Sequence, residues 1–474
     1  MDSIEKPVAK PSYEELEKML LQALERIKQL EAIIARMQIK PDLNSQNSSK
    51  PPSSDPPWQP RSERKKSKRS IGGQKGHSGQ TLKWQNKPDQ VLIHRPIGTC
   101  TCGRCIGQAS ISKVVKRQML DLPELRILVT EHHFETRICT CGIKHSSPIP
   151  KEFNVLVQYG FRVKSLAIYL MNTQFLSLKR CELFFTEVIK TSISQGSLVN
   201  WQALGFKLLE GVEQQIASAI RDSNVVHADE TGIHVNGKLQ WWHSASTPLL
   251  THYHLSTKRG FDGMMGGGIL QSLTGFLVHD CFAAYFKFKA IHALCNAHLM
   301  RELTRVFETT SQEWACTLKV LLISMKQAVE TQELSAEQRF DFEVCFQDLV
   351  QQGLALNPER LRIETTVGKR GRVGQGFTRS LLMRLRTHQS SWLRFLSDPR
   401  VPFDNNLAER DVRMVKVKEK VSGGSRGNGA VWFARIRGYV STLRKQGQDV
   451  FHAFEQLFIG NVMLPTSLAL PNTS

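Results

Sequence analysis

The 474-residue chain has no run of about 18 apolar residues, the length that a membrane-spanning helix requires, so we expect no membrane segment. Its first residues, MDSIEKPVAKPSYEELEK, also lack the apolar core of a secretory signal, which predicts a cytoplasmic protein. Acidic residues are scarce relative to basic ones: 43 Asp and Glu stand against 63 Lys and Arg, giving a net charge of +20. This imbalance favours a polyanionic partner.

Apolar side chains are also scarce between residues 41 and 90, where PDLNSQNSSKPPSSDPPWQP predicts a disordered linker. A basic run, RSERKKSKR, continues it, and either contacts phosphate or forms a solvated tether. The phosphate-contact hypothesis assigns nucleic-acid binding to Arg64, Lys65, Lys66, Lys68 and Arg69. The following glycines, GGQKGHSG, lack the Gly-Lys-Ser/Thr ending of a nucleotide-binding loop, which excludes that kind of site.

Residues 12–38 carry a heptad pattern within the N-terminal region 1–40. The spacing alternates between 4 and 3 residues, as in a coiled-coil seam, at Leu16, Leu20, Ala23, Ile27, Leu30, Ile34 and Met37. We expect this helix to form a homodimer or a higher oligomer. The alternative is an amphipathic helix that packs on its own chain.

The pattern after the linker predicts a multidomain α/β protein. Short β-prone runs (NVVHAD, LQWWHSAS, LLTHYHLS and GFLVHD) precede long helical patterns, and one final helix is expected from VWFARIRGYVSTLRKQ to FHAFEQLF. The predicted regions are a cysteine module at 91–150, a helical DNA-binding region at 151–220, a catalytic α/β domain at 221–460 with a helical insertion at about 300–400, and a disordered tail at 461–474.

Two similar cysteine pairs mark the module at 91–150. Cys100-Thr101-Cys102-Gly103 and Cys139-Thr140-Cys141-Gly142 each place two thiols before a glycine, an arrangement that can offer both sulfurs to one structural zinc ion. Cys105 forms a rival pair with Cys102, and His132, His133 and His145 are spare ligands. The alternative for the module is reduced structural cysteines, which is our interpretation of Cys181, Cys281, Cys295, Cys316 and Cys345.

Three acids carry the expected chemistry. Asp229 ends the apolar run NVVHAD, and Asp280 ends GFLVHD. Two strand-end aspartates can share a divalent cation such as Mg²⁺, and Glu409 in DNNLAER is the best third carboxylate, one turn into a helix that Asp404 or Asn405 could cap. Two metal ions held by carboxylates would serve phosphodiester cleavage. The alternative is ordinary solvated acids and turn formers.

Other side chains supplement this site. Lys258, Arg259, Arg301 and Arg410 are candidates for holding flanking phosphates. His298 and Arg301 share one helical face, where a buried structural histidine competes with a role in orienting DNA or a carboxylate. Trp241 and Trp242 are adjacent on a predicted strand, so one is expected in the core while the other could stack on a base.

At these residues the sequence resembles transposases of the insertion sequence 66 family. The resemblance covers nearly the whole chain and rests on ordered blocks: NSQNSSKPPSSD, GGQKGHSG, VQYG, HADETG, STKRG, DCFAAY, CNAHLMREL and FDNNLAERDVR. It includes the N-terminal zipper and the cysteine module. The family spaces its zinc cysteines as Cys-x-x-Cys, whereas each pair here is one residue shorter.

The resemblance implies a ribonuclease H-like catalytic core, a mixed β-sheet flanked by helices, with Asp229, Asp280 and Glu409 as an Asp-Asp-Glu triad. It implies magnesium-dependent cleavage at terminal inverted repeats and strand transfer into target DNA, with water and then a freed 3′-hydroxyl as nucleophiles. The zinc module would help to recognise the repeats, and the protein would work at the bacterial nucleoid. A non-catalytic DNA-binding regulator and a nuclease that cuts without joining are the alternatives.

Overall fold

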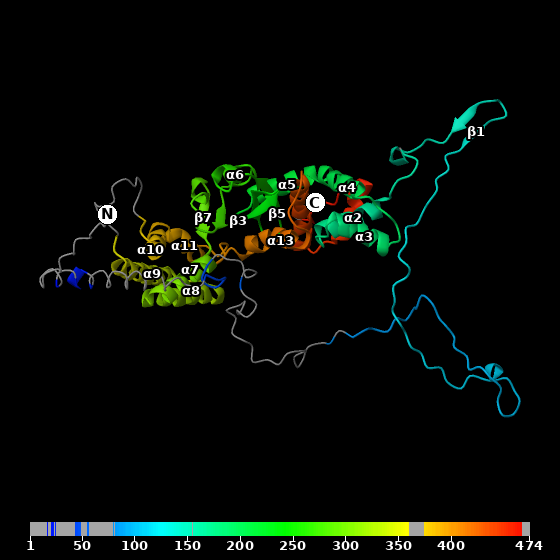
Figure 1. The fold of residues 1–474 in the computed structure, drawn as a ribbon, viewed down its shortest axis with the longest axis horizontal. Helices are drawn as coiled ribbons and strands as arrows, with labels where there is room; N and C mark the ends of the chain where they lie inside the picture. Colours follow the sequence, from blue (N-terminus) through cyan, green and yellow to red (C-terminus); the bar gives the residue numbers. More distant parts are fainter. Residues whose placement is uncertain are drawn as a thin grey trace, which may run out of the picture. The chain divides into compact units, whose positions relative to one another are not determined.

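The computed structural model describes residues 81–153, 155–359 and 374–466, together with residues 17, 20–22, 24, 43–48, 55 and 79. The chain divides into two compact units (Figure 1). The larger comprises Met1–Glu63, Ile149–Glu182 and Ile193–Ser474, and the smaller comprises Arg64–Pro148 and Leu183–Ser192.

Several predicted features lie outside the described residues. They are most of the N-terminal coiled coil, most of the linker including its glycine segment, and residues 467–474 of the tail. The basic linker residues Arg64, Lys65, Lys66, Lys68 and Arg69 lie outside them as well. Their predicted roles therefore remain predictions.

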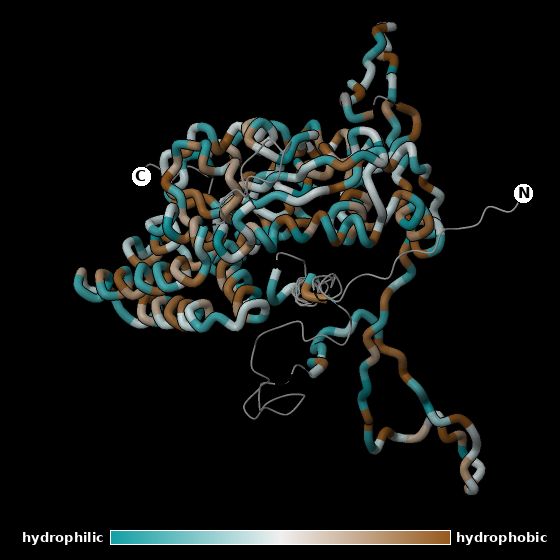
Figure 2. Tube along the Cα trace, turned by 60° about the vertical axis from the view of Figure 1, so that its left-hand side comes forward, coloured by the Kyte–Doolittle hydropathy of each residue, from teal (hydrophilic) through white to brown (hydrophobic). Residues whose placement is uncertain are grey.

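The smaller unit has little regular structure in the stretch 81–148. Its elements there are the 3₁₀ turn η2 (Ile106–Gln108) and an antiparallel hairpin of β1 (Thr136–Ile138) and β2 (Lys144–Ser146). The sequence VVKRQMLDLP between the two cysteine pairs contains β-prone residues but forms no strand in this described stretch. Hydrophobic residues along it, such as Val114 and Leu120, are exposed. Figure 2 shows brown, hydrophobic stretches on the extended parts of the tube.

A mixed five-stranded sheet lies in the larger unit. Its order is β5-β4-β3-β6-β7, formed by Thr251–Ser256, Lys238–Ser246, Val225–Val235, Phe276–His279 and Ile291–Leu294 in that order. β3, β4 and β5 pair antiparallel, whereas β6 and β7 run parallel to β3. All four residues of β6 are buried, as expected for an inner strand of a parallel pair. The four β-prone runs of the sequence all form strands here.

Helices precede and follow the sheet along the chain. Those before it are η3 (Lys151–Phe153), α2 (Phe161–Asn172), α3 (Leu178–Glu187), α4 (Gln195–Leu208) and α5 (Glu210–Arg221). Ser194 caps α4 by accepting from the Ser197 amide at 3.1 Å, which satisfies a free donor of the first turn. α5 buries Val212, Ile216 and Ile220, which recur every four residues along one face.

Short turns and helices connect the strands, and a longer group of helices follows β7. The short elements are α6 (Phe261–Met265), η4 (Leu270–Ser272) and η5 (Tyr285–Lys287). The later group is α7 (Asn296–Thr310), α8 (Glu313–Thr331), α9 (Ala336–Leu356), α10 (Phe377–Thr387), α11 (Gln389–Trp392) and α12 (Arg394–Ser397). Figure 1 shows this group gathered beside the β7 end of the sheet, where α11 and α12 contact β7.

Three helices close the fold: α13 (Asn406–Ser422), α14 (Gly429–Lys445) and α15 (Val450–Ile459). The sequence predicts one final helix where α14 and α15 stand, and that prediction is wrong. Gly447 adopts a left-handed φ of +68°, and the Asp449 side chain caps a new helix by accepting from the amides of Phe451 and His452.

Two hydrophobic clusters hold the sheet against these helices. One joins Val278 and Leu294 of the parallel strands to α7–α12, with Trp392 fully buried. The other packs Trp242 and Phe433 together, between the antiparallel strands and the helices α13 and α14. The parallel strands therefore share one core with α7–α12, and the antiparallel strands share another with α13 and α14. Within the described ranges no helix has the length and hydropathy to cross a membrane.

Candidate active site

Asp229 and Asp280 meet at one edge of the sheet because β3 and β6 pair in parallel. The pairing sets Val225 opposite Phe276 and His227 opposite Val278, an offset of 51 residues (276 − 225), and Asp229 and Asp280 follow that last pair at the same offset (280 − 229). β6 ends at His279, so Asp280 is the first residue beyond it. The structure thus brings the two aspartates together, but only Asp280 stands at a strand end. The expectation that the strand ends at Asp229 is wrong, because β3 stays paired with β4 as far as Val235.

The two aspartates lie in a strongly acidic and poorly solvated place. Burial raises the pKa of Asp229 well above its ordinary value, and the charges of Glu230, Asp280 and Glu409 raise it further. Burial, followed by the charge of Glu230, raises the pKa of Asp280 to about 6. Without a cation, these carboxylates therefore repel one another at neutral pH.

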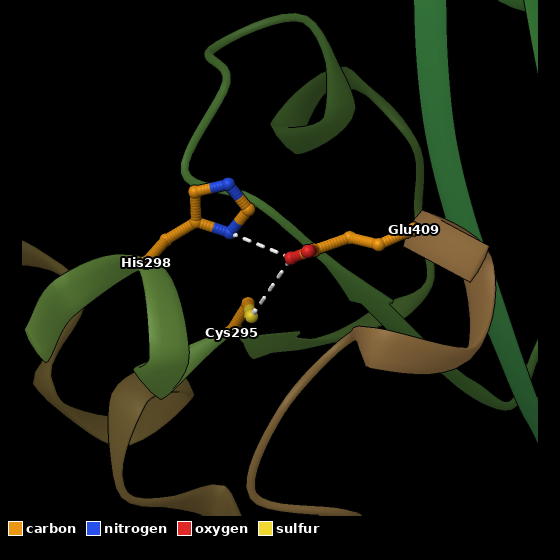
Figure 3. Close-up of side chains that lie close together, drawn as sticks. All are labelled: Cys295, His298 and Glu409. Atoms are coloured by element: carbon orange, nitrogen blue, oxygen red, sulfur yellow. Dashed lines mark hydrogen bonds and ion pairs between the residues drawn. The ribbon is translucent and has the colours of Figure 1, made fainter. Parts of the chain in front are cut away.

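Glu409 reaches the same place from α13, although it is 129 residues beyond Asp280 (409 − 280). Its Oε1 lies 3.3 Å from Nδ1 of His298 and 3.6 Å from a guanidinium nitrogen of Arg301, both on α7. The Sγ of Cys295, the N-cap residue of α7, lies 4.0 Å from the same oxygen (Figure 3). His298 and Arg301 therefore face a carboxylate, the alternative that the sequence ranks below a buried structural histidine.

The loop before α13 fastens Glu409 to the strand that bears Asp229. Asn405 is the N-cap residue but its side chain caps nothing; it bonds Nδ1 of His227 and the carbonyl of Ala228, both at 2.8 Å. The Asn406 amide donates instead to Asp404 at 3.0 Å. The predicted capping role of Asn405 is therefore wrong, because its side-chain amide is already hydrogen-bonded to two groups of buried strand β3.

A buried ion pair fixes α13 from the other side. Asp411, two residues beyond Glu409, accepts from Lys445 at 2.8 Å and from the hydroxyl of Ser246 at 2.7 Å. The hydroxyl of Tyr253 donates to the Asp411 carbonyl at 3.0 Å. Because all these groups are largely buried, the contacts hold the first turns of α13 in one position, and with them Glu409.

A fourth acid, Glu230, belongs to the site although the sequence analysis passes over it. Its side chain is only 1% exposed; it accepts from the hydroxyl of Tyr285 at 2.5 Å and from Arg259 at 3.0 Å. Its charge is the largest electrostatic contribution to the raised pKa of both Asp229 and Asp280. In the sequence, Glu230 could have been recognised as the second acid in HADETG, because it directly follows Asp229 within a predicted buried strand.

The model of the Transposase IS66 family matches residues 157–431, more than half of the chain and the whole of this site. The chain belongs to the IS66 family of transposases. This confirms the resemblance that the sequence blocks indicate. A family of unknown function (DUF6444) matches residues 5–83. No curated protein matches the chain.

In this transposase-family fold, Arg259 is held beside the acids by two aromatic rings. Its guanidinium lies 4.9 Å from the ring centre of Trp241 and 4.4 Å from that of Phe282, and its side chain is 45% exposed. Trp242, the next residue of β4, points to the other face of the sheet and is buried in the core. The two tryptophans thus divide between core and surface, as their adjacency predicts.

The other predicted phosphate contacts differ in how they are placed. Lys258 pairs with Asp262 at 2.8 Å on the exposed side of α6, and Arg410 is exposed on α13 next to Glu409. Arg301 is largely buried against Glu409 instead. Arg301 therefore serves the carboxylate first, whereas Arg259, Lys258 and Arg410 have exposed surface to offer to a ligand.

The two cysteine pairs of the smaller unit form the same turn twice. The amide of Cys100 donates to the Arg104 carbonyl and that of Gly103 to the Cys100 carbonyl, while Gly103 has a φ of +82°. Cys139 and Gly142 repeat these bonds, with a φ of +86° at Gly142. In each turn the second cysteine lowers the thiol pKa of the first, through its backbone amide and its side chain.

These turns fit a metal-binding role because each presents two exposed thiols with one of lowered pKa. The structure does not bring the two turns together. Among the described residues, three or more metal-binding donors within 4.8 Å of one another occur only at Cys295, His298 and Glu409. The predicted zinc ligands thus remain predicted rather than assembled: Cys100, Cys102, Cys139 and Cys141, with Cys105 as the alternative.

The carboxylates at the sheet edge are suited to a divalent cation. Asp229, Asp280 and Glu409 offer hard oxygen donors. Burial first, and then the neighbouring negative charges, raise the pKa of Asp229, and a bound cation would offset both effects. Arg259 offers an anion-binding group beside them. The arrangement can therefore bind cations and a phosphate at one place, which is the combination that phosphoryl transfer requires.

Proposed function

We propose that this chain is a magnesium-dependent Asp-Asp-Glu transposase that cleaves DNA at the terminal inverted repeats of an insertion sequence and joins the ends to target DNA. Asp229, Asp280 and Glu409 are the proposed metal ligands and catalytic residues. The observation that carries the proposal is their convergence: the charges of Asp280 and Glu409 both raise the pKa of Asp229, although the three acids come from β3, the end of β6 and α13.

The sheet supports a ribonuclease H-like core for this enzyme. Three antiparallel strands, β3 to β5, continue into a parallel pair, β6 and β7, on the far side of β3. In this arrangement β3 is central, and its neighbour β6 delivers the second acid at the carboxyl end of a parallel pair. Ligands of α/β sheets bind at that end of the strands.

When bound, two Mg²⁺ ions would activate the attacking oxygen and stabilise the leaving oxygen of the phosphodiester. The chain's own part is to hold those charges in place. Asp229 and Asp280 are fixed by strand pairing and by backbone amides at 2.9 and 3.1 Å, and Glu409 by the anchored start of α13. The attacking oxygen would belong first to water and then to a freed 3′-hydroxyl, so no covalent protein–DNA intermediate is required.

Arg259 is placed to hold a phosphate that flanks the cleaved bond. The rings of Trp241 and Phe282 both contact its guanidinium group and limit its movement. Its Nε donates a hydrogen bond to Glu230 at 3.0 Å. Its remaining donors are directed by these contacts while almost half of the side chain stays exposed. Lys258 and Arg410 would add less specific attraction from the surface.

The other regions have proposed roles in assembly and DNA recognition. The N-terminal heptads would dimerise the chain, and the basic linker with the helices of 151–220 would contact the terminal repeats. A structural zinc ion would unite the turns of Cys100/Cys102 and Cys139/Cys141. A protein that acts on DNA in this way would work in the cytoplasm, at the bacterial nucleoid.

The test uses Glu409→Gln in the full-length chain. We expect the variant to bind DNA that carries the element's terminal repeats with unchanged affinity and to lose magnesium-dependent cleavage, because an amide cannot replace the carboxylate as a ligand. Asp404→Asn is the matched control, since an asparagine keeps the amide contact of Asn406. Cleavage that survives in Glu409→Gln would exclude this residue from the triad.

A strand-transfer assay with pre-cut ends separates the related possibilities. A transposase joins such ends to target DNA in the presence of Mg²⁺, whereas a nuclease of related fold only cuts. A regulator without catalysis would bind the ends and do neither. Joining by the wild-type chain, lost in Asp229→Asn, is the outcome that the proposal requires.

A further inference from the structure

Cys295, His298 and Glu409 gather three different metal-binding groups at one point. The Sγ of Cys295, a ring nitrogen of His298 and a carboxylate oxygen of Glu409 all lie within 4.8 Å of one another (Figure 3). Cys295 and His298 stand three residues apart across the start of α7, and Glu409 faces them from the first turns of α13. The group does not include Asp229 or Asp280.

We propose that these three residues form a binding site for a thiophilic divalent cation, Zn²⁺ in the first instance, which competes with catalysis by taking Glu409. The inference rests on the proposed function in one respect, namely that Glu409 is a ligand of the catalytic metal. The site itself does not depend on that role. It would make the enzyme sensitive to free zinc.

The donor distances suit a tetrahedral ion. Zinc bonds of about 2.0 Å to nitrogen or oxygen and about 2.3 Å to sulfur imply donor separations of about 3.3 Å for N and O and about 3.5 Å for S and O. The observed separations from Glu409 Oε1 are 3.3 Å to His298 Nδ1 and 4.0 Å to Cys295 Sγ. A shift of about half an ångström in the thiol would bring it to the tetrahedral separation from the Glu409 oxygen, and the fourth corner would remain for water.

The chemistry of the donors selects against magnesium. A thiolate and an imidazole are ligands of zinc and related ions, whereas Mg²⁺ prefers oxygen donors in an octahedron. Burial lowers the pKa of His298 to about 4, so the ring is neutral at pH 7 and keeps a lone pair for a metal. Its Nδ1 is buried, and no hydrogen bond satisfies it.

The thiol has support for the charged form that a metal requires. The backbone amide of Asn405 donates to Cys295 Sγ at 3.1 Å, a contact typical of ligand sulfurs. Burial, with the charge of Glu409, raises the pKa of Cys295 to about 12, so the thiol is protonated without a metal. Binding therefore breaks the S–H bond, forms a Zn–S bond and releases one proton to solvent.

Arg301 opposes the cation and defines a second state of the site. Its guanidinium lies 3.6 Å from the same Glu409 oxygen and neutralises that carboxylate when no zinc is present. Zinc has to displace this contact, which lowers its affinity. Replacing Arg301 with an uncharged residue should therefore tighten zinc binding, an effect opposite to that of replacing a ligand.

The experiment uses Co²⁺ as a spectroscopic substitute for zinc in the full-length, reduced and metal-free chain. Tetrahedral Co²⁺ with a thiolate ligand gives intense visible bands and a sulfur-to-metal charge-transfer band. The exposed cysteines of residues 100–141 are expected to bind Co²⁺ as well, so the quantity measured is the difference in bound Co²⁺ equivalents between wild type and each variant. Wild type should bind one more equivalent than Cys295→Ser or His298→Asn, and Cys316→Ser should match wild type.

The functional reading is inhibition by zinc at constant Mg²⁺. Zinc should inhibit DNA cleavage by wild type and Cys316→Ser at concentrations at least tenfold lower than those that inhibit His298→Asn. Arg301→Gln should bind Co²⁺ at least about threefold more tightly than wild type. If Cys295→Ser does not fold, His298→Asn and Arg301→Gln carry the test, since both side chains are partly exposed.

The outcomes separate this inference from the proposed function. Equal Co²⁺ stoichiometry in wild type, Cys295→Ser and His298→Asn would overturn the site, even where Asp229→Asn abolishes cleavage as proposed. A missing equivalent in both ligand variants would establish the site even if Asp229→Asn still cleaved DNA, in which case the proposed triad alone is wrong. Inhibition by zinc that is identical in His298→Asn and wild type would contradict the competitive role.

Discussion

The acidic site and the cysteine turns assemble their residues in opposite ways. Asp229, Asp280 and Glu409 are distant in sequence, and buried strands and an anchored helix bring them together. Cys100 and Cys139 are each separated from a partner cysteine by one residue. A local hydrogen-bonded turn positions each pair of exposed thiols, without help from a hydrophobic core. The first arrangement is made by tertiary packing, whereas the second needs an additional bond to become one site.

The comparison teaches what a metal ion would do in each place. At the acids, the protein fold already holds the proposed ligands together, so a cation there would serve the proposed chemistry. At the cysteines, the turns are preformed but separate, so a cation would supply the cross-link that gives the smaller unit a core. The following predictions would break or sharpen that contrast, and they run from the largest expected effect to the smallest.

Asp229→Asn should reduce magnesium-dependent cleavage by a factor of about 10³ or more, since losing a ligand removes several kcal/mol of transition-state stabilisation. The variant should fold normally because its packing is unchanged. Single-turnover cleavage of terminal-repeat DNA measures the effect. Asp222→Asn, an exposed acid just before β3, is the matched control and should cleave like wild type.

Zinc should protect the smaller unit from proteolysis by about a hundredfold, because structural zinc provides much of the folding free energy of such modules. Limited digestion of the full-length chain with and without a chelator measures cutting within residues 81–148. Cys102→Ser should remove the protection, and Cys345→Ser should keep it. Equal digestion rates with and without zinc would show that the cysteine pairs are not a metal site.

Asp280→Asn should stabilise the metal-free chain by about 1–3 kcal/mol at neutral pH, since the folded pKa of about 6 exceeds the ordinary value of 3.8. The sign follows from proton binding: the folded state holds the proton more tightly, so charging Asp280 costs stability as pH rises from about 4 to 6. Urea unfolding with a chelator, at pH 4 and pH 7.5, measures the difference. It should be near zero at pH 4, and Mg²⁺ should reverse its sign at pH 7.5.

Arg259→Gln should weaken binding of terminal-repeat DNA by about five- to tenfold and reduce the slope of log affinity against log salt by about one, the effect of one lost phosphate contact. Lys238→Gln, at the exposed start of β4, is the control for a change of charge alone. Fluorescence anisotropy over a salt series measures both quantities. An unchanged slope in Arg259→Gln would show that this side chain does not contact phosphate.

Much of the catalytic region is predictable from local patterns. Apolar runs of NVVHAD and GFLVHD identify β3 and β6, and the acids that end them are visible as breaks in those runs. β7 is as short as β6 but is not identified, because IHAL has no distinctive flank. The break between α14 and α15 depends on the left-handed conformation of Gly447. The sequence shows only a single glycine there, which a continuous helix can also contain.

The residues that sequence analysis misjudges are those whose role depends on a distant neighbour. Cys295 looks like any buried cysteine until α13 places Glu409 against it. Asn405 looks like a helix cap until β3 offers it a buried histidine and a carbonyl. Glu230 acquires its importance from Arg259 and Tyr285, and neither spacing nor hydropathy marks those contacts.

The parallel pairing of β3 with β6 also sets limits on how this chain can change. The segment between α6 and β6 can lengthen or shorten without displacing Asp280, since this residue directly follows β6, which is held by its pairing with β3 and β7. One residue inserted inside β6 is a different matter, because side chains alternate between the two faces and Asp280 would then project away from Asp229. Insertions and deletions in descendants of this gene should therefore accumulate at 266–275 and spare 276–280.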